Sequence, residues 1–457
     1  MDDFKIKLNY QQQQIYKIVE NGENLFLTGA GGVGKSFLIK YLNETFRERG
    51  IRVDLTAMTG IAGLNIGGST IHRWAGIGKG DSSKAEMLMM ARKCTKNWKN
   101  TSILVIDEVS MLSPILMDKL DYVGRSIRRV NKPFGGIQLI FSGDFCQLPP
   151  VETDKYCFEC HTWIACNFRE CELTENMRQS DPVFQLLLKE IRMGIVTKKS
   201  KTILQEKLHA KLDIPHGIIP MKLFPTKKAA DRVNDAEVKK ISREDNKPFK
   251  YTALHYIINP NKIKTTDERE KQWVGSLQKS CPAKDSIILL KTVQVMLIQN
   301  LDPEAGLVNG SKGMVTDFED GRPIVQFANG IIRTIKPHDW TLKINDNIEV
   351  GRRQIPLVYG YAVTIHKSQS LTIDYVDADM GRENFADGQI YTALSRVRTL
   401  EGLTISALDL SNVSCHPKVV EFYKNLTRFT LNENDRPRIE VEERNEIVED
   451  IIIDETE

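Results

Sequence analysis

The stretch NLFLTGAGGVGKSFLIKYL, residues 24–42, decides the fold of this chain. Its first part is an apolar run typical of a buried strand, and its last part places Leu38, Ile39 and Leu42 at helical spacing. Between them, GAGGVGKS (29–36) has four free positions between its first glycine and the closing GKS. A glycine-rich loop between a strand and a helix brings backbone N–H groups to phosphate oxygens. The stretch therefore predicts an α/β fold with a phosphate-binding loop.

Three further apolar runs end in polar or glycine residues, as the first one does. They are RVDLTA (52–57), SILVIDE (102–108) and IQLIFSGD (137–144). Amphipathic stretches such as residues 36–50 separate them. This alternation predicts a parallel sheet covered by helices, with functional groups at the carboxyl ends of the strands.

A second unit of the same kind begins near residue 181 and is interrupted. MKLFPTKKAADRVNDAEVKK (221–240) has the pattern of strand, turn and helix, but short alternating runs such as VQVMLI and GMVTDF then follow up to about residue 353. The α/β pattern resumes at YGYAVTIHKSQS (359–370). We therefore expect a small β-barrel inserted into a second α/β domain.

The expected domain boundaries follow from these changes of pattern. They are a first α/β domain at 1–180 with a small helical insertion at about 79–100, a second α/β domain at 181–240 and 354–430, an inserted β-rich domain at 241–353, and a disordered acidic tail at 431–457.

The charge of the chain is unevenly distributed. Residues 432–457 hold eleven Asp and Glu against three Arg, a charge of −8, so that the rest of a chain with overall charge +3 carries +11. This basic body could attract a polyanion, or it could be an ordinary solvated surface. The tail is a possible site for a protein partner.

Composition places the chain among soluble globular proteins. Of its 457 residues, 41% are hydrophobic and 27% are charged, and no apolar run is long enough to span a membrane. The N-terminus lacks the pattern of a signal or transit peptide. We expect a soluble intracellular protein, nuclear or cytoplasmic, and a monomer.

Four cysteines fall within fifteen residues, CFECHTWIACNFREC (157–171). Cys157, Cys160, Cys166 and Cys171 could bind zinc, but their gaps lack the paired spacing of zinc ribbons and fingers. The interleaved aromatic residues favour a packing role and reduced thiols.

The phosphate loop and an acidic pair supply the parts of a nucleotide hydrolysis site. Lys35 is suited to the outer phosphates and Ser36 to a Mg²⁺ ion. Asp107 would hold the metal, and Glu108 would orient or deprotonate the attacking water. These parts alone also fit nucleotide kinases and switch GTPases. The residues expected to bind the nucleotide in this loop are Gly29, Ala30, Gly31, Gly32, Val33, Gly34, Lys35 and Ser36.

Three longer segments carry a resemblance to a known family. TAMTGIAGLNIGGSTIHRWAGIG (56–78), DKLDYVGRSIRRVNKPFGGIQLIFSGDFCQLPP (118–150) and RRQIPLVYGYAVTIHKSQSLTID (352–374) resemble superfamily one DNA helicases of the Pif type, over about residues 8–427. The resemblance implies two RecA-like parallel-sheet motor domains with an inserted SH3-like barrel. It also implies ATP with Mg²⁺, and movement 5′ to 3′ on single-stranded DNA with unwinding of tailed or structured duplexes.

The resemblance adds four residues to the hydrolysis site. Gln12 would read the adenine edge through its amide, and Gln147 would sense the γ-phosphate. Arg178 and Arg396 would reach the nucleotide from across the cleft between the two motor domains. Arg396 would belong to the second motor domain and touch the γ-phosphate only when that cleft closes. Hydrolysis and domain motion would then become one event.

Hydroxyl, amide and imidazole groups in both halves are suited to DNA phosphates. Each hydroxyl taken alone is more often a helix cap or turn residue. Trp74 and Phe134 could stack on bases, but we expect them in the core. The residues expected to contact DNA are Thr59, Gly60, Ser69, Thr70, His72, Thr226, Thr364, His366, Lys367 and Ser368.

Three functions remain open at this point. The first is a helicase, the second a DNA-stimulated translocase that strips proteins without unwinding, and the third a DNA-binding scaffold with a vestigial ATPase. The filled catalytic positions disfavour the scaffold. Ser370 and Met177 depart from the family pattern, which usually has glycine and an aromatic residue there. The 79–100 insertion could be the strand-separating wedge, and the loop GLVNGSKG (306–313) could guide the strand or be a plain hairpin connection.

Overall fold

The structure of the protein is a computed structural model. It describes residues 8–150, 153–242, 247–261, 264–345, 348–369, 371–381, 386–426, 428–429 and 439–440. Ser370 and most of the acidic tail lie outside the described residues. The chain forms two compact units, which we call unit 1 and unit 2. Unit 1 takes its described residues from 1–58, 66–177 and 415–457, and unit 2 from 59–65 and 178–414.

Unit 1 is built on a six-stranded sheet whose strands all run parallel, in the order β3-β2-β4-β5-β1-β6. The four strands predicted from the sequence are confirmed, and the short strands β3 and β6 are additions that the apolar runs did not indicate. The strands are β1 (Leu25–Thr28), β2 (Val53–Ala57), β3 (Ser69–Thr70), β4 (Ile103–Asp107), β5 (Gln138–Ser142) and β6 (Arg169–Glu172).

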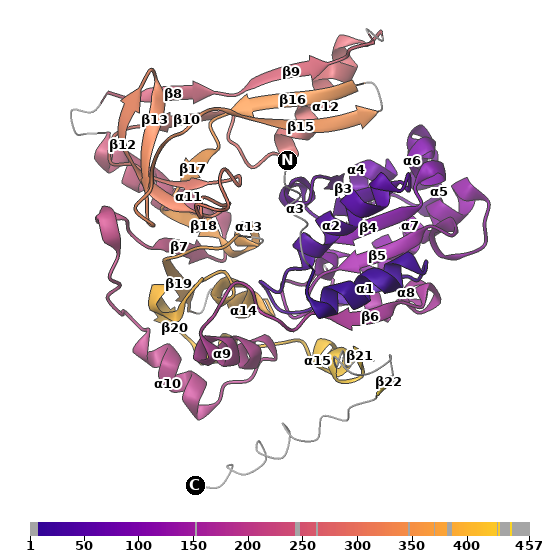
Figure 1. Ribbon diagram of the computed structural model, residues 1–457, viewed down its shortest axis with the longest axis horizontal. Coiled ribbons are helices and arrows are strands. Elements are labelled where there is room, and N and C mark those ends of the chain that lie inside the picture. Colours follow the sequence, from indigo (N-terminus) through magenta and orange to yellow (C-terminus); the bar gives the residue numbers. More distant parts are fainter. Residues whose placement is uncertain are drawn as a thin grey trace. The chain divides into compact units, whose positions relative to one another are not determined.

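Helices cover this sheet because each presents an apolar stripe to it. In α2, the buried side chains are Leu38, Ile39, Leu42 and Phe46, and they pack in one core with strand residues of β1, β2 and β4. Figure 1 shows these helices around the indigo-to-magenta sheet. The helices of this unit include α1 (Tyr10–Glu20), α2 (Lys35–Glu48), α4 (Ile71–Ala75), α7 (Pro114–Arg128), α8 (His161–Cys166) and α15 (Pro417–Lys424).

The helical insertion near residues 79–100 is anchored at its C-terminal end. It contains α5 (Lys84–Ala91), a 3-10 turn and α6 (Thr95–Asn100). Trp98 of α6 is fully buried, and its ring lies 4.7 Å from that of Trp74. Arg128 donates to the carbonyl oxygens of Trp98 and Lys99 at 2.7 and 3.1 Å, where a cation satisfies the end of a helix.

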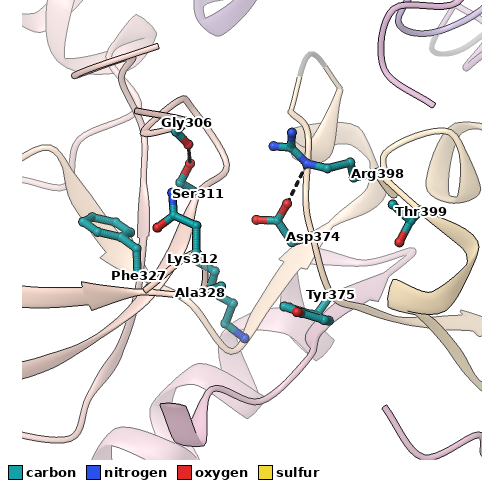
Figure 2. Close-up of a pocket in the computed structure, with 10 residues that line it drawn as sticks. Gly306, Ser311, Lys312, Phe327, Ala328, Asp374, Tyr375, Arg398 and Thr399 are labelled. Atoms are coloured by element: carbon teal, nitrogen blue, oxygen red, sulfur yellow. Dashed lines mark hydrogen bonds and ion pairs between the residues drawn. The ribbon is translucent and has the colours of Figure 1, made fainter. Parts of the chain in front are cut away.

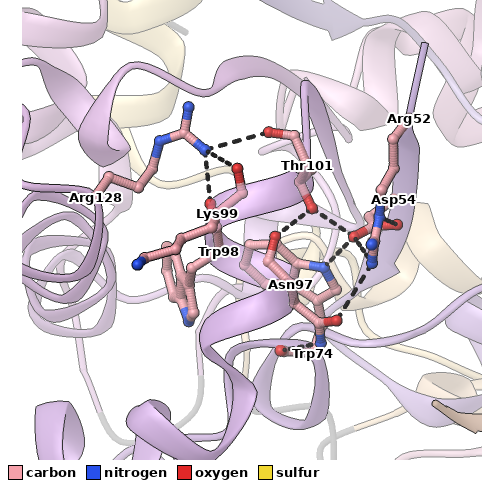
Figure 3. A network of polar contacts seen from close by, with 8 residues as sticks. All are labelled: Arg52, Asp54, Trp74, Asn97, Trp98, Lys99, Thr101 and Arg128. Atoms are coloured by element: carbon pink, nitrogen blue, oxygen red, sulfur yellow. Dashed lines mark hydrogen bonds and ion pairs between the residues drawn. The ribbon is translucent and has the colours of Figure 1, made fainter. Parts of the chain in front are cut away.

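A polar network ties the same helix to the sheet (Figure 3). Asp54 of β2 accepts hydrogen bonds from Trp74 Nε1 at 2.7 Å and from the Thr101 hydroxyl at 2.5 Å, and it forms an ion pair with Arg52. Asn97 donates to the Trp74 carbonyl at 2.9 Å. The base of the insertion is therefore held firmly to β2. A wedge role for it stays a prediction.

Unit 2 contains a second parallel sheet, of four strands in the order β18-β7-β19-β20. This confirms a second α/β element after the first one. Its strands are β7 (Met221–Phe224), β18 (Ala362–Thr364), β19 (Val376–Met380) and β20 (Leu403–Leu408). The accompanying helices are α9 (Pro182–Arg192), α10 (Lys198–Glu206), α11 (Lys227–Ile241), α13 (Ile365–Ser368) and α14 (Gln389–Leu394).

The inserted region of unit 2 is β-rich and antiparallel, but an SH3-like barrel is not confirmed. Its described strands form three sheets, with orders β14-β13-β12-β11-β17, β15-β16-β9 and β10-β8. Two separate apolar cores lie under them, one of which includes Trp340 and packs against α12 (Asp267–Ser280). The strands are β8 (Phe249–Thr252), β9 (Leu254–Ile258), β10 (Ser286–Leu289), β11 (Gln294–Leu297), β12 (Lys312–Glu319), β13 (Arg322–Phe327), β14 (Ile332–Thr334), β15 (His338–Asn345), β16 (Ile348–Gln354) and β17 (Leu357–Tyr359).

The division into units differs from the predicted domains at the C-terminal segment. The prediction assigns 354–430 to the second α/β domain, whereas the chain re-enters unit 1 at Cys415. The physical reason lies in α15, where Phe422 stacks on Phe158 with ring centroids 4.4 Å apart. Lys418 also forms an ion pair with Glu159 at 2.6 Å.

The cysteine-rich segment packs as a core element of unit 1. Its four cysteines are buried free thiols, and Trp163 lies in a cluster of aromatic rings with Phe26, Phe145 and Phe422. This agrees with the packing interpretation of the sequence. In the described part of the chain, no helix is both long and apolar enough to span a membrane.

Candidate functional site

The phosphate loop lies between β1 and α2, as the sequence predicts. Gly29, Gly32 and Gly34 have φ angles of 136°, 93° and 87°, which side chains rarely adopt. A Cβ at Gly29 would also lie 2.4 Å from the Leu173 carbonyl oxygen. The Lys35 ammonium donates to the carbonyls of Gly29 and Ala30 at 2.6 and 3.0 Å, within its own loop. The loop thus presents the N-terminus of a fourteen-residue helix together with a lysine.

The acidic pair follows β4 at the carboxyl edge of the sheet. Asp107 is buried, and this burial raises the pKa of its carboxyl, while Lys35 is close enough to oppose that shift. Glu108 has φ 54° and ψ 44°, a left-handed conformation that is costly for a glutamate. Such strain is often retained at a functional position, because the turn sets the direction of the side chain.

Gln12 lies in the first turn of α1, and its side-chain amide nitrogen is a buried donor to which the described part of the chain offers no acceptor. Its Oε1 accepts from the Asn9 backbone N–H at 3.1 Å in a capping box. Its Nε2 is buried and has no hydrogen-bond partner among the residues that the structure describes. This nitrogen lies 3.3 Å from the position that a Cβ on Gly34 would take, so it borders the phosphate loop. The carbonyl half of the amide is therefore engaged, and the donor half is available to a nucleotide.

Gln147 is buried at the end of a short turn after β5. Its backbone N–H donates to the Asp144 carbonyl at 3.0 Å, and Asp144 itself is almost fully buried. Asp144 Oδ1 accepts from the Cys146 N–H at 3.2 Å and from the Tyr423 hydroxyl at 3.2 Å. The sequence analysis did not single out Asp144 or Tyr423. Only the position of Asp144, just after a predicted strand, could have indicated it.

Arg178 and Arg396 come together in unit 2, although 217 residues separate Arg178 from Ser395. Arg178 donates to the Ser395 carbonyl at 2.7 Å, and Arg396 donates to the Ser395 hydroxyl at 2.7 Å and to the Thr392 carbonyl at 3.0 Å. Gln179, which sequence reasoning missed, is buried and donates to the carbonyls of Ser395 and Val397 at 3.3 and 2.7 Å. The two predicted arginines therefore form one cluster. Their approach to the phosphate loop stays a prediction.

Several of the predicted DNA-contact residues are helix caps. The Thr70 hydroxyl accepts from the Arg73 N–H at 3.3 Å at the start of α4, directly after Ser69 in β3. His72 follows in the same helix, and burial lowers the pKa of its imidazole. At neutral pH this imidazole is therefore a neutral hydrogen-bonding group.

Thr226 and Thr364 occupy matching positions in unit 2. Both are N-caps, with hydroxyls that accept from the N–H groups of Ala229 at 3.4 Å and Lys367 at 3.2 Å. They follow the neighbouring strands β7 and β18, which pair so that Thr364 lies opposite Phe224. The two helix N-termini therefore lie side by side at one edge of this sheet. This arrangement suits phosphate groups, because helix N-termini favour anions.

The remaining predicted contacts are more varied. Ser368 is fully buried and donates to the Ile365 carbonyl at 2.7 Å, while burial lowers the pKa of His366. Thr59 and Gly60 start α3 (Gly60–Asn65) in unit 2, and the Thr59 hydroxyl accepts from the Ala62 N–H at 3.2 Å. Ser368 is thus the predicted contact that the structure supports least.

The expected core aromatics and the strand-guiding loop can also be placed. Trp74 and Phe134 are buried, as expected. The loop 306–313 lies in the connection between the antiparallel strands β11 and β12, which agrees with the hairpin interpretation. It borders a cavity of about 400 Å³ within unit 2 (Figure 2). In that cavity Asp374 and Arg398 form an ion pair at 2.7 Å.

The fold and the site together define a class of protein. The class is that of phosphate-loop nucleoside triphosphatases. It is defined by a parallel sheet, a glycine-rich loop at a helix N-terminus and an acidic pair after a neighbouring strand. This chain has a second parallel sheet in addition. A family profile described as PIF1-like helicase matches residues 7–201, and one described as DNA helicase Pif1, 2B domain, matches residues 272–318.

Three comparisons agree with this assignment. The chain is 36% identical over 433 residues to the ATP-dependent DNA helicase PIF1 of Xenopus laevis, covering 93% of this chain and 65% of that protein. It is 32% identical to the crystal structure of Pif1 helicase from Candida albicans, with a TM-score of 0.72, covering 92% and 100% of the two chains. It is 28% identical to Pif1 helicase from Bacteroides in complex with ADP-AlF3 and ssDNA, with a TM-score of 0.60, covering 92% and 97%. The chain belongs to the PIF1-like helicase family.

Proposed function

We propose that this protein is an ATP-dependent DNA helicase that moves 5′ to 3′ on single-stranded DNA and unwinds tailed or structured duplexes. The observation that carries the proposal is the site of unit 1, where Lys35 lies within electrostatic reach of Asp107 at the phosphate loop. The family membership and the similarity to ATP-dependent DNA helicases support the choice of DNA and of ATP. The direction of movement rests on the resemblance alone. Since the chain spans about 65% of the length of the Xenopus protein, these activities are proposed for the chain by itself.

The residues fit a nucleotide with a divalent cation. The unpartnered Nε2 of Gln12 offers a donor to the base, and the loop offers backbone N–H groups and Lys35 to the phosphates. Ser36 is an exposed residue with a hydroxyl, and Asp107 has a carboxylate; Mg²⁺ prefers such oxygen ligands. When bound, Mg²⁺ would supply charge neutralisation at the phosphates.

Different residues of the chain would have different roles in hydrolysis. Glu108 would accept a proton from the attacking water, and Gln147 would contact the γ-phosphate from its buried turn. Arg178 and Arg396 would stabilise the developing charge, which an arginine from another domain can do by about 10³ to 10⁵ in rate. Because both arginines belong to unit 2, hydrolysis would require groups from both units.

The capped helix N-termini in the two units are the proposed contacts to the DNA backbone. Thr70 and His72 would act in unit 1, and Thr226, Thr364 and Lys367 in unit 2. Alternate tightening of the two sets during the ATP cycle would move the protein along a strand. Separation of a duplex requires about 1.4 kcal/mol per base-pair step, so movement must be coupled to hydrolysis.

A strand-displacement assay tests the proposal. Duplexes with a 5′ tail, a 3′ tail or no tail are incubated with the protein and ATP, and strand release is measured. We expect release of the 5′-tailed duplex and none with Lys35→Ala. Arg47→Ala changes an exposed residue on the same helix and serves as the matched control. ATP hydrolysis stimulated by single strands without release of any duplex would favour the translocase function instead.

A further inference from the structure

The C-terminal helix α15 places a tyrosine against the nucleotide site of unit 1. The helix is held by Phe422, which stacks on Phe158, and by the ion pair of Lys418 with Glu159. The next residue, Tyr423, is 3% exposed, and its ring centroid lies 5.5 Å from that of Phe422. Its side chain is therefore buried in unit 1.

The hydroxyl of Tyr423 is hydrogen-bonded to three groups of the described chain, as a donor and as an acceptor. It donates to Asp144 Oδ1 at 3.2 Å, accepts from the Phe145 N–H at 3.1 Å, and is bonded to the Thr28 hydroxyl at 2.7 Å. Thr28, Asp144 and Phe145 are each almost fully buried. Hydrogen bonds among buried groups at these distances fix the relative positions of the partners.

The partners of this hydroxyl lead to two different parts of the nucleotide site. Thr28 is the last residue of β1, directly before Gly29 of the phosphate loop. Asp144 and Phe145 begin the turn that holds Gln147, since the Asp144 carbonyl accepts from the Gln147 N–H. One hydroxyl therefore joins the start of the phosphate loop to the turn that carries the proposed γ-phosphate sensor.

We propose that Tyr423 is a positioning residue for ATP hydrolysis, which sets the distance between the phosphate loop and the Gln147 turn. The inference rests on the proposed function, because it assigns Gln147 a role in hydrolysis. In sequence, Tyr423 follows all the motifs of unit 2, and the chain re-enters unit 1 only at Cys415. The nucleotide site of unit 1 is thus complete only when the C-terminal segment is docked on it.

A positioning role predicts a particular kinetic pattern. Nucleotide binding depends mainly on the loop and on Gln12, whereas the chemical step depends on where Gln147 meets the γ-phosphate. Loss of the hydroxyl should therefore lower kcat more than it changes KM for ATP. A residue that only stabilises the fold would instead lower the melting temperature without a selective effect on kcat.

The test uses Tyr423→Phe in the full chain, which removes the hydroxyl and keeps the ring. We expect kcat for strand-stimulated ATP hydrolysis to fall about tenfold, which corresponds to about 1.4 kcal/mol in the barrier, with KM changed by less than about twofold. Amide hydrogen exchange at Phe145 should become faster, because its acceptor is lost. Glu421→Gln changes an exposed side chain on the same helix and is the matched control: it should leave kcat, KM and the melting temperature close to the wild-type values.

A second variant removes the hydrogen bond between the Tyr423 and Thr28 hydroxyls from the Thr28 side. Thr28→Val removes the partner hydroxyl with little change of shape, and the double variant with Tyr423→Phe should be no slower than the slower single variant. Normal kcat in Tyr423→Phe, or a fall in kcat that appears only close to the melting temperature of that variant, would overturn the inference. Both outcomes would leave the proposed function intact. A wild-type protein without strand-stimulated turnover would instead refute the proposed function, and this inference with it.

Discussion

Two substitutions at Glu108 separate the chemical role of its carboxylate from the conformational cost of its left-handed backbone. In the left-handed region, a side chain costs about 1–2 kcal/mol relative to glycine, and glycine itself costs about 0.5–1 kcal/mol through the unfolded chain. Glu108→Gln removes the carboxylate and keeps the strained backbone, with φ 54°. Glu108→Gly removes the carboxylate and relieves the strain. The glycine variant should therefore be more stable than the glutamine variant by about 0.5–1 kcal/mol.

Both variants should lose hydrolysis. A general base contributes about 10² to 10⁴ in rate, so strand-stimulated ATP turnover should fall at least about 100-fold in each. Thermal melting without nucleotide measures the difference in stability between the two variants. For a unit of about 200 residues, the expected free-energy difference raises the melting temperature of Glu108→Gly above that of Glu108→Gln by about 1–4 °C.

Two results would refute this reasoning separately. If Glu108→Gly melted at or below the temperature of Glu108→Gln, the left-handed turn would not be strained. If either variant retained turnover within about tenfold of wild type, Glu108 would not be the base, and the acidic pair would have another role.

Three further predictions concern buried polar groups. Burial lowers the pKa of Lys312 to about 7, so between pH 7 and 8.5 the unfolded chain binds more protons than the folded one. The free energy of unfolding should therefore rise with pH by up to about 1.4 kcal/mol per pH unit from this group. Lys312→Met should lose that slope when denaturation is measured across this pH range. Gln12→Ala should raise KM for ATP by about tenfold and reduce the preference over GTP, because a buried donor is lost, whereas Gln14→Ala should leave both unchanged. Gln179→Ala removes the donor to the buried Val397 carbonyl, while the Ser395 carbonyl keeps the hydrogen bond from Arg178. The variant should lower the free energy of unfolding by about 1–3 kcal/mol and reduce strand-stimulated turnover; normal values of both in the purified variant would contradict its role.

The elements of the fold that could be predicted depend on local patterns. The four main strands of the first sheet are continuous apolar runs, and the phosphate loop needs glycines where φ is positive, as at Gly29 and Gly34. The inserted region could be recognised as β-rich by its alternation. The way in which its strands join into sheets could not be predicted, because strand order depends on contacts between distant residues. The described strands form three sheets where one barrel was expected.

The parts of the site that escaped prediction depend on pairs of residues far apart in sequence. Tyr423 is 279 residues from Asp144, and Gln179 is 216 residues from Ser395. Periodicity indicates that such side chains are buried, but it does not name their partners. Thr364, in contrast, could be interpreted locally, because a hydroxyl that caps a helix contacts an N–H three residues later.

We propose that hydrolysis at the phosphate loop of unit 1 requires a group from unit 2, and substitution of Arg396 is the sharpest test of this requirement. The measurement is strand-stimulated ATP turnover by Arg396→Ala and Arg396→Lys beside nucleotide affinity in the same preparations, with Arg398→Ala as the neighbouring control. We predict nucleotide affinity within about threefold of wild type and turnover lower by at least about 100-fold in both variants, because lysine cannot replace the planar guanidinium. Wild-type turnover in Arg396→Ala would contradict the account.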